Sequence, residues 1–291
     1  MPKKTLLRFA HLSDLHFSTP SWNPLQLFSK RWIGNLNLLL RRKREFNEAQ
    51  LYQLLPLLQQ RNVTTVLLTG DLTSTSHPKE FALASDYVDA LKNAGLRTFL
   101  LPGNHDHYTK AADQQRVFYR YFDSEYNTPY RLKENRITTT ELGHNWWLFA
   151  IDTTLATSLL TCHGHFFKEL EETLRKALQS IPEGHQVILM NHFPFFELTS
   201  KKKNLLRGEA LQELLTQFPQ VKFYLHGHTH RHTIADLRPS GLPIILDSGC
   251  SANKEDGSFN LVEIHTEGCD VEVFRINDHT WQSVKQVNLK W

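Results

Sequence analysis

The chain has 291 residues, of which 40% are hydrophobic and 22% are charged, and its formal net charge is +3. These fractions exclude a disordered or fibrous protein, and the charge is weaker than that of a dedicated nucleic-acid-binding domain. Three cysteines without a Cys-x-x-Cys pair argue against a disulfide scaffold and against a cysteine zinc site. The sequence shows neither a signal peptide nor a membrane span, so we expect a cytoplasmic protein.

Short apolar runs predict strands along the chain, and each run ends abruptly at a polar motif. These runs occupy residues 6–13, 64–69, 97–102, 146–151, 186–190, 221–225 and 243–246. Their continuous apolar character is typical of strands buried on both faces. Apolar spacing near 3.6 predicts helices over residues 48–60, 79–94, 168–180 and 208–217. This alternation predicts an α/β fold with a largely parallel sheet.

The C-terminal part has a different pattern. Residues 259–274 alternate between apolar and polar on either side of Gly268, which predicts an antiparallel hairpin. No linker, repeat or low-complexity tract interrupts the chain, so we expect one domain over residues 1–291. Because ligands in open α/β sheets bind beyond the carboxyl ends of the strands, the polar motifs should gather at one edge.

Residues with oxygen or imidazole side chains follow these strands. The set consists of Asp14, His16, Asp71, Asn104, His192, His228 and His230. A mixed set without a thiolate suits Mn, Fe, Co or Zn. The set is larger than one tetrahedral ion needs and can hold two divalent ions if a carboxylate bridges them. Asp71 is the natural bridge, because it follows Gly70 at a turn where the backbone can approach closely.

Two ions about 3.5–4 Å apart supply hydroxide near neutral pH and hold the attacking and leaving oxygens of a phosphate ester in line. His105 follows Asn104 and should point into the same crevice. There it can protonate the leaving oxygen or stabilise the charged transition state. We expect Asp106 to orient His105, which makes both residues catalytic candidates.

The motifs, in order, resemble those of the calcineurin-like metallophosphoesterase family. They are Asp-x-His at 14–16, Gly-Asp at 70–71, Gly-Asn-His-Asp at 103–106, a lone His192, and Gly-His-x-His at 227–230. The resemblance implies two packed sheets flanked by helices, a four-layer αββα sandwich. It implies one ion held by Asp14, His16, Asp71 and His230, and a second held by Asp71, Asn104, His192 and His228. It also implies that His105 is the catalytic histidine.

The residues within two of these motifs indicate the class of substrate. Gly-Asp-Leu-Thr at 70–73 and Gly-His-Thr-His-Arg at 227–231 are similar to those of the bacterial cyclic-nucleotide phosphodiesterases. The resemblance therefore implies hydrolysis of a phosphodiester in a small nucleotide-like substrate by a metal-bridging hydroxide. The first alternative is a pyrophosphatase of a lipid-linked nucleotide sugar such as UDP-diacylglucosamine. A nuclease and a non-catalytic scaffold are weaker alternatives, since no extended basic groove is evident and no ligand is missing.

A basic amphipathic insertion is predicted at about residues 22–46. Leu25, Phe28, Trp32, Leu36 and Leu39 recur at helical spacing, and Arg41 to Arg44 add positive charge. Such a segment can close over the site as a lid, or residues 25–46 can contact an anionic membrane surface.

The remaining polar candidates are expected to be structural. His11 is expected to be a buried strand residue, and His107, His163, His165 and His226 are expected to have structural or supporting roles. His232 is the main rival of His230 as a ligand, but it lies outside the Gly-His-x-His spacing. Asp152 and Asp247 are expected in turns or caps, and a nucleophilic role for Cys250 is not expected. Lys201 to Lys203 are predicted to form a solvated loop, and contact with an anionic substrate or a membrane is the alternative.

Overall fold

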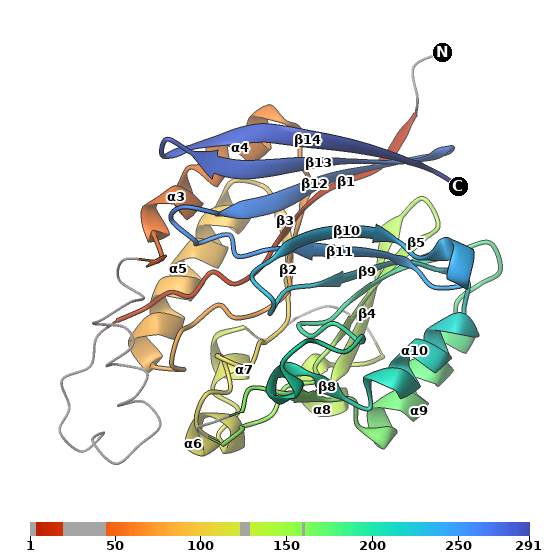
Figure 1. Ribbon diagram of the computed structural model, residues 1–291, viewed down its shortest axis with the longest axis horizontal. Helices are drawn as coiled ribbons and strands as arrows, with labels where there is room; N and C mark the ends of the chain where they lie inside the picture. The colour runs from red at the N-terminus through yellow and green to blue at the C-terminus, as the bar shows by residue number, and fades with distance from the viewer. Residues whose placement is uncertain (1–3, 20–44, 123–128, 159–160) are drawn as a thin grey trace.

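The computed structural model describes residues 4–19, 45–122, 129–158 and 161–291. Two six-stranded sheets pack face to face, and helices cover their outer faces (Figure 1). The predicted four-layer αββα sandwich is therefore confirmed.

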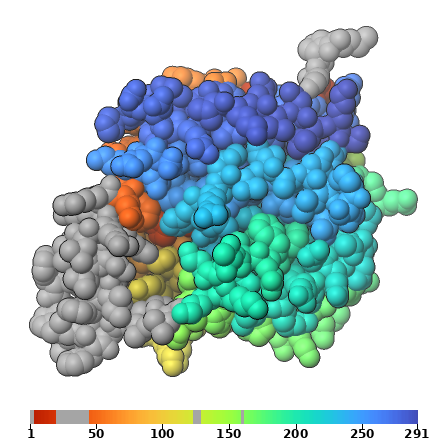
Figure 2. Space-filling view, viewed as in Figure 1, coloured from red at the N-terminus to blue at the C-terminus, as the bar shows by residue number. Residues whose placement is uncertain are grey.

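The first sheet has the strand order β14-β13-β12-β1-β2-β3. Its parallel half consists of β1 (Thr5–Leu12), β2 (Thr65–Leu68) and β3 (Arg97–Leu100). Its antiparallel half consists of β12 (Ser258–His265), β13 (Gly268–Asn277) and β14 (Thr280–Lys290). This C-terminal part of the chain forms the blue surface along the top of Figure 2. The helices on this side are α3 (Glu48–Tyr52), α4 (Leu54–Gln60) and α5 (Pro78–Asn93). His77 and Glu80 form a capping box that fixes the start of α5.

The second sheet has the order β10-β11-β9-β7-β5-β4. Its parallel strands are β5 (Trp146–Ile151), β7 (Gln186–Met190), β9 (Val221–His226) and β11 (Ile244–Ser248). The antiparallel strands β4 (Ile137–Gly143) and β10 (His232–Asp236) form its edges. The helices α9 (Lys168–Gln179) and α10 (Gly208–Thr216) pack on its outer face.

Short elements lie in the loops between these layers. The helices among them are α6 (Lys110–Gln114), α7 (Phe118–Tyr121) and α8 (Leu132–Asn135). A two-stranded parallel sheet joins β6 (Gly164–His165) to β8 (Leu205–Leu206). The single turns of 3₁₀ helix are η3 (Lys201–Lys203) and η4 (Arg238–Ser240).

The strands of the second sheet are apolar on both faces because each face packs against a different core. Ile188 and Met190 of β7 belong to the large core that includes the strands of the first sheet. Their neighbours Val187 and Leu189 belong to a second core with α9 and α10. Successive side chains of a strand point to opposite faces, so a continuous apolar run satisfies both layers.

Two sequence expectations need correction. The sheets are mixed rather than largely parallel, although β1–β2–β3 and β11–β9–β7–β5 are parallel. The helix predicted over residues 48–60 is divided at Gln53 into α3 and α4. The other predicted helices and strands and the C-terminal hairpin lie within a few residues of their expected positions.

The predicted insertion at about residues 22–46 lies outside the described residues, apart from Glu45 and Phe46. Its lid and membrane roles both stay predictions, as does the single-domain organisation. Across the ranges that the structure describes, no helix has the length and hydropathy of a membrane span.

Candidate metal centre

The predicted metal ligands follow parallel strands of both sheets. Asp14 and His16 follow β1, Asp71 follows β2, and Asn104 follows β3. His192 follows β7, while His228 and His230 follow β9 of the other sheet. Most of these residues have positive φ angles: Asp14 (57°), His16 (47°), Asp71 (53°), His228 (70°) and His230 (56°). Left-handed backbone is unfavourable for such residues, and its concentration here is typical of a functional site.

One group of candidate ligands converges on Asp14. Its Oδ1 lies 3.1 Å from His230 Nε2 and 3.6 Å from His16 Nε2. The two imidazole nitrogens are themselves 3.1 Å apart. Burial opposes ionisation of Asp14, but the charge of His230 holds the pKa of this carboxyl well below its usual value. Two imidazoles and one carboxylate oxygen that meet in this way can hold a divalent cation.

A second group converges on Asp71. His192 Nδ1 donates a hydrogen bond to Thr69 O at 2.8 Å. Its Nε2 therefore faces the site, 3.1 Å from Asn104 Oδ1 and 3.5 Å from Asp71 Oδ2. Burial disfavours the charged imidazole, but Asp71 outweighs this effect and raises the pKa of His192 to about 9. A buried positive charge is thus stabilised at a place where a metal ion would supply one.

The two groups form one continuous site. Candidate ligand atoms of Asp14, Asp71 and His192 all lie within 4.8 Å of one another. The side chains that meet here belong to both sheets, and all but that of His230 are buried. Buried carboxylates without a balancing cation are costly, and the donors are the nitrogen and oxygen atoms that borderline divalent metals prefer. The residues present therefore fit two divalent ions, with Asp71 next to both groups.

His228 joins the site through its backbone and its ring. Its N–H donates to Asp14 Oδ2 at 3.0 Å. Its Nε2 donates to Lys203 O at 3.1 Å, which leaves Nδ1 as the nitrogen able to bind a metal. Burial lowers the pKa of His228 to about 3, so this ring is neutral near pH 7.

The two catalytic candidates, His105 and Asp106, form hydrogen bonds to different partners. His105 donates its N–H to Asp71 Oδ1 and its Nδ1 contacts Ser74 O, both at 2.7 Å. The Asp106 carboxylate instead accepts backbone hydrogen bonds from Leu72, Thr73 and Gly103. The role of Asp106 in orienting the His105 ring stays a prediction. A carbonyl binds that ring, while Asp106 fixes the turns that present Asp71 and Asn104.

Glycines permit the close approach of these turns. A Cβ added to Gly103 would overlap the carboxylate and the backbone nitrogen of Asp71. A Cβ added to Gly227 would lie 2.5 Å from Asp14 Oδ2. Both glycines belong to motifs noted in the sequence, and the structure gives the steric reason for them.

Two contacts with the candidate ligands were not predicted from the sequence. Phe46 stacks on His16 with ring centroids 4.7 Å apart and an interplanar angle of 26°. Cys250 donates its thiol to Asp14 O at 3.1 Å and lies close to His16 and His230. Burial and the charge of Asp14 raise the pKa of Cys250 well above its usual value, which agrees with the prediction that it is not a nucleophile. For Cys250, the only signal in the sequence was its position shortly after the strand β11.

Other polar candidates support the fold. His11 is buried on β1 and contacts Thr69 Oγ1, as expected for a structural strand residue. His232, the rival ligand, lies on β10 and bonds to Asn260 of β12. Asp247 receives hydrogen bonds from Gly249 N and Thr229 Oγ1, which is a turn role that also holds the segment between His228 and His230. Asp152 accepts from Tyr119 and Thr154.

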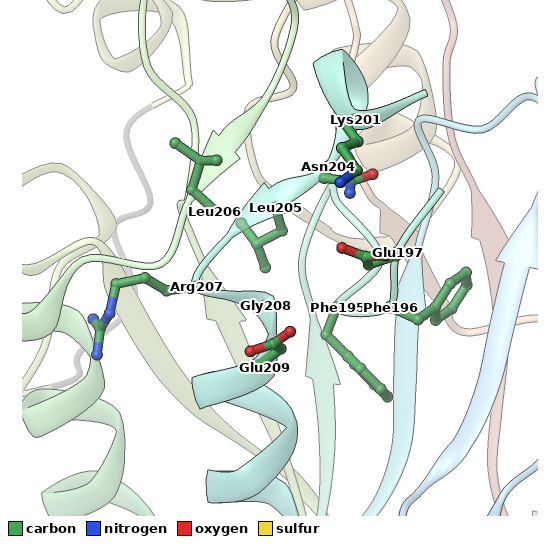
Figure 3. Close-up of a pocket in the computed structure, with 10 residues that line it drawn as sticks. All are labelled: Phe195, Phe196, Glu197, Lys201, Asn204, Leu205, Leu206, Arg207, Gly208 and Glu209. Atoms are coloured by element: carbon green, nitrogen blue, oxygen red, sulfur yellow. The ribbon is translucent and has the colours of Figure 1, made fainter. Parts of the chain in front are cut away.

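Residues of the loop at 197–207 line two cavities. The larger, of about 320 Å³, is bounded by Phe195, Glu197, Lys201, Leu205 and Arg207, among others (Figure 3). The smaller, of about 180 Å³, is lined by Leu198, Thr199, Ser200, Lys203, Thr229 and Arg231. Thr229 and Arg231 flank His230, so the smaller cavity adjoins the candidate metal centre.

Comparison with known proteins agrees with this geometry. A zebrafish (Danio rerio) dimetal phosphatase structure superposes with a TM-score of 0.68 over 99% of both chains at 13% identity, a likeness of fold alone. The chain is 26% identical over 188 residues to the 3′,5′-cyclic adenosine monophosphate phosphodiesterase CpdA of Haemophilus influenzae, covering 63% of this chain and 61% of that protein. It is 23% identical to CpdA of Escherichia coli, covering 77% of this chain and 78% of that protein.

The matched part of the H. influenzae relative is less than two thirds of its length. These relatives nevertheless bear out the resemblance to bacterial cyclic-nucleotide phosphodiesterases. The family model described as calcineurin-like phosphoesterase matches residues 7–232, which contain every predicted site residue. The predicted enzyme class, a phosphoric ester hydrolase, agrees with this match, and the chain belongs to the calcineurin-like phosphoesterase family.

Proposed function

We propose that this protein is a dinuclear metal-dependent phosphoesterase that hydrolyses a phosphodiester in a nucleotide-like substrate. The observation that carries the proposal is the convergence of seven nitrogen- and oxygen-bearing side chains from two sheets, with Asp71 beside both groups. Two divalent ions bound there would supply a hydroxide nucleophile near neutral pH and neutralise charge on the phosphate.

The two groups of ligands would divide the ions between them. Asp14, His16 and His230 would hold one ion, and Asn104, His192 and His228 the other, with Asp71 shared. Thr69 O accepts a hydrogen bond from Nδ1–H of His192, and Lys203 O accepts one from Nε2–H of His228. These two hydrogen bonds fix the orientations of the rings. Such partners select the tautomer that leaves the other nitrogen free to bind metal.

His105 would act on the leaving group. Its Nδ1 contacts Ser74 O, so Nε2 is the nitrogen available for proton transfer. Its ring stands edge-on to His16 at 5.1 Å, which places it beside the candidate ligands. In the hydrolysis, water oxygen bonds to phosphorus as the phosphorus–oxygen bond to the leaving group breaks. The departing oxygen would take a proton from His105.

The substrate proposal rests on the relatives. Those reported above are cyclic adenosine monophosphate phosphodiesterases, which supports a phosphodiester of a small nucleotide-like molecule. The test is a substrate comparison with protein reconstituted in turn with Mn²⁺, Fe²⁺, Co²⁺ and Zn²⁺. The substrates are bis(p-nitrophenyl) phosphate, p-nitrophenyl phosphate, 3′,5′-cyclic AMP and a nucleoside-diphosphate lipid. We expect turnover of the diesters above the monoester; turnover of the monoester alone would overturn the proposed preference.

A further inference from the structure

We propose that Lys203 and Arg231 form a subsite for a second phosphate group of the substrate, next to the phosphate that is hydrolysed. This inference rests on the proposed function and adds, within its substrate class, a preference for molecules with two neighbouring phosphates. The observation that carries it is the small cavity of about 180 Å³ that adjoins the candidate metal centre.

The lining of this cavity is suited to an anion. Lys203 and Arg231 provide two positive charges, and Thr199 and Ser200 provide hydroxyl groups. None of these lining residues is acidic. Within the described part of the chain, neither Lys203 nor Arg231 takes part in an ion pair. Guanidinium and ammonium groups with free donors are the usual protein partners of phosphate oxygens.

Backbone contacts fix the cavity to the metal centre on one side. Lys203 O accepts the hydrogen bond from His228 Nε2, so the lysine backbone touches a candidate ligand directly. Lys203 N bonds to Ser200 O at 2.9 Å, and Asn204 Oδ1 accepts from Leu198 N at 2.9 Å. These bonds close the loop on itself and hold Lys203 at the cavity.

The other side is fixed by the turn that carries His230. Arg231 N donates to Thr229 Oγ1 at 3.0 Å, and the same hydroxyl donates to the buried Asp247. The backbone of Arg231 is therefore tied to its turn, while its side chain is exposed at the cavity. A phosphate bound between the metal ions would have this cavity as its neighbour.

The loop also provides a matched control. Lys201 belongs to the same 3₁₀ turn as Lys203 and carries the same charge, but it lines the other cavity (Figure 3). A general effect of surface charge would involve both lysines equally, whereas a subsite next to the metal centre involves Lys203 alone. The Lys201→Gln variant should keep wild-type turnover of bis(p-nitrophenyl) phosphate.

The experiment compares the binding of ADP and AMP to Mn²⁺-loaded full-length protein by isothermal titration calorimetry, with free Mn²⁺ held constant. Wild type should bind ADP about tenfold more tightly than AMP. Lys203→Gln and Arg231→Gln should each remove most of this preference, and Arg231→Lys should keep part of it. Lys201→Gln should leave it unchanged. Thermal melting of each variant confirms that the fold is intact.

Equal binding of ADP and AMP by wild type would overturn the subsite, as would an equal loss of preference in Lys201→Gln. Calorimetry does not depend on turnover, so the two proposals fail separately. A protein that prefers ADP but hydrolyses no phosphodiester would contradict the proposed function and leave the subsite standing. A protein that hydrolyses phosphodiesters but binds both nucleotides equally would contradict the subsite and leave the proposed function standing.

Discussion

At the scale of single residues, Asp71 and His105 occupy adjoining positions but should fail differently when changed. Asp71 lies beside both ligand groups, so Asp71→Asn should reduce the occupancy of both ions. His105 contacts Ser74 O and no ligand role is proposed for it, so His105→Asn should keep its metal. Its rate should fall by roughly 10²–10⁴ if it is the general acid.

Metal analysis together with steady-state kinetics distinguishes the two variants. The loss in His105→Asn should be smaller for an aryl ester, because a nitrophenolate leaves without being protonated. If His105→Asn loses its metal as Asp71→Asn does, the division of roles between them is wrong.

Gly103 gives a steric prediction. Gly103→Ala would push a methyl group into the Asp71 carboxylate, so metal content and turnover should both be lost. Gly184 is the matched control, because an added Cβ there meets nothing within 4 Å, although its φ is +79°. Gly184→Ala should cost about 1 kcal/mol of stability from backbone strain and leave metal content unchanged. Elemental analysis of both variants checks this, and normal metal binding by Gly103→Ala would contradict the packing described.

At the scale of elements, the segment before α3 supports the metal centre. Its backbone pairs with the loop after β11, through Asn47 N to Ala252 O at 2.9 Å and Lys254 N to Glu45 O at 2.7 Å. This pairing presents Phe46 to the ring of His16. Phe46→Ala should weaken metal binding by about 10–100-fold, as is common for residues that orient ligands. Phe46→Tyr keeps the ring and should bind metal like wild type.

Metal titration monitored by calorimetry measures the effect. Unchanged affinity in Phe46→Ala would show that the stacked ring does not orient His16.

Some strands of the two sheets could be predicted from the sequence and others could not. Buried strands such as β2 and β7 were found because both of their faces are apolar. In the two large sheets the missed strands are β4, β10 and β14, which are all edge strands, and β14 is almost entirely exposed. Edge strands carry polar residues that blunt their unpaired edges, so their periodicity is weak.

The residues of the candidate metal centre also divide into those that the sequence predicted and those that it did not. Its proposed ligands were predicted because each lies in a local motif after a strand. The stacking of Phe46 on His16, the thiol contact of Cys250 and the carbonyl partner of His105 were not predicted, because they are contacts between distant segments.

At the scale of the whole molecule, the candidate metal centre joins the two sheets. Asp14, Asp71 and Asn104 follow strands of the first sheet, and the other sheet supplies His192, His228 and His230. Metal bound there would stabilise the packing of the sheets, because only the folded chain brings these ligands together. Mn²⁺ at about 100 times its Kd should stabilise metal-free protein by about 2.7 kcal/mol. For a chain of this size, that corresponds to a rise in Tm of roughly 5–10 °C.

Differential scanning calorimetry of protein with and without Mn²⁺ measures this shift, with Asp71→Asn as the control that should lose most of it. An equal rise in wild type and Asp71→Asn would place the stabilising ion elsewhere on the molecule.

Under the proposed function, the converging side chains hold two ions that hydrolysis requires. The most direct measurement is a titration of chelator-treated protein with Mn²⁺, following bound metal by elemental analysis and turnover of bis(p-nitrophenyl) phosphate in the same samples. We predict negligible turnover without metal and full activity as occupancy approaches two ions per chain. Full turnover by protein shown to be metal-free, or an activity that saturates at one ion per chain, would contradict the account.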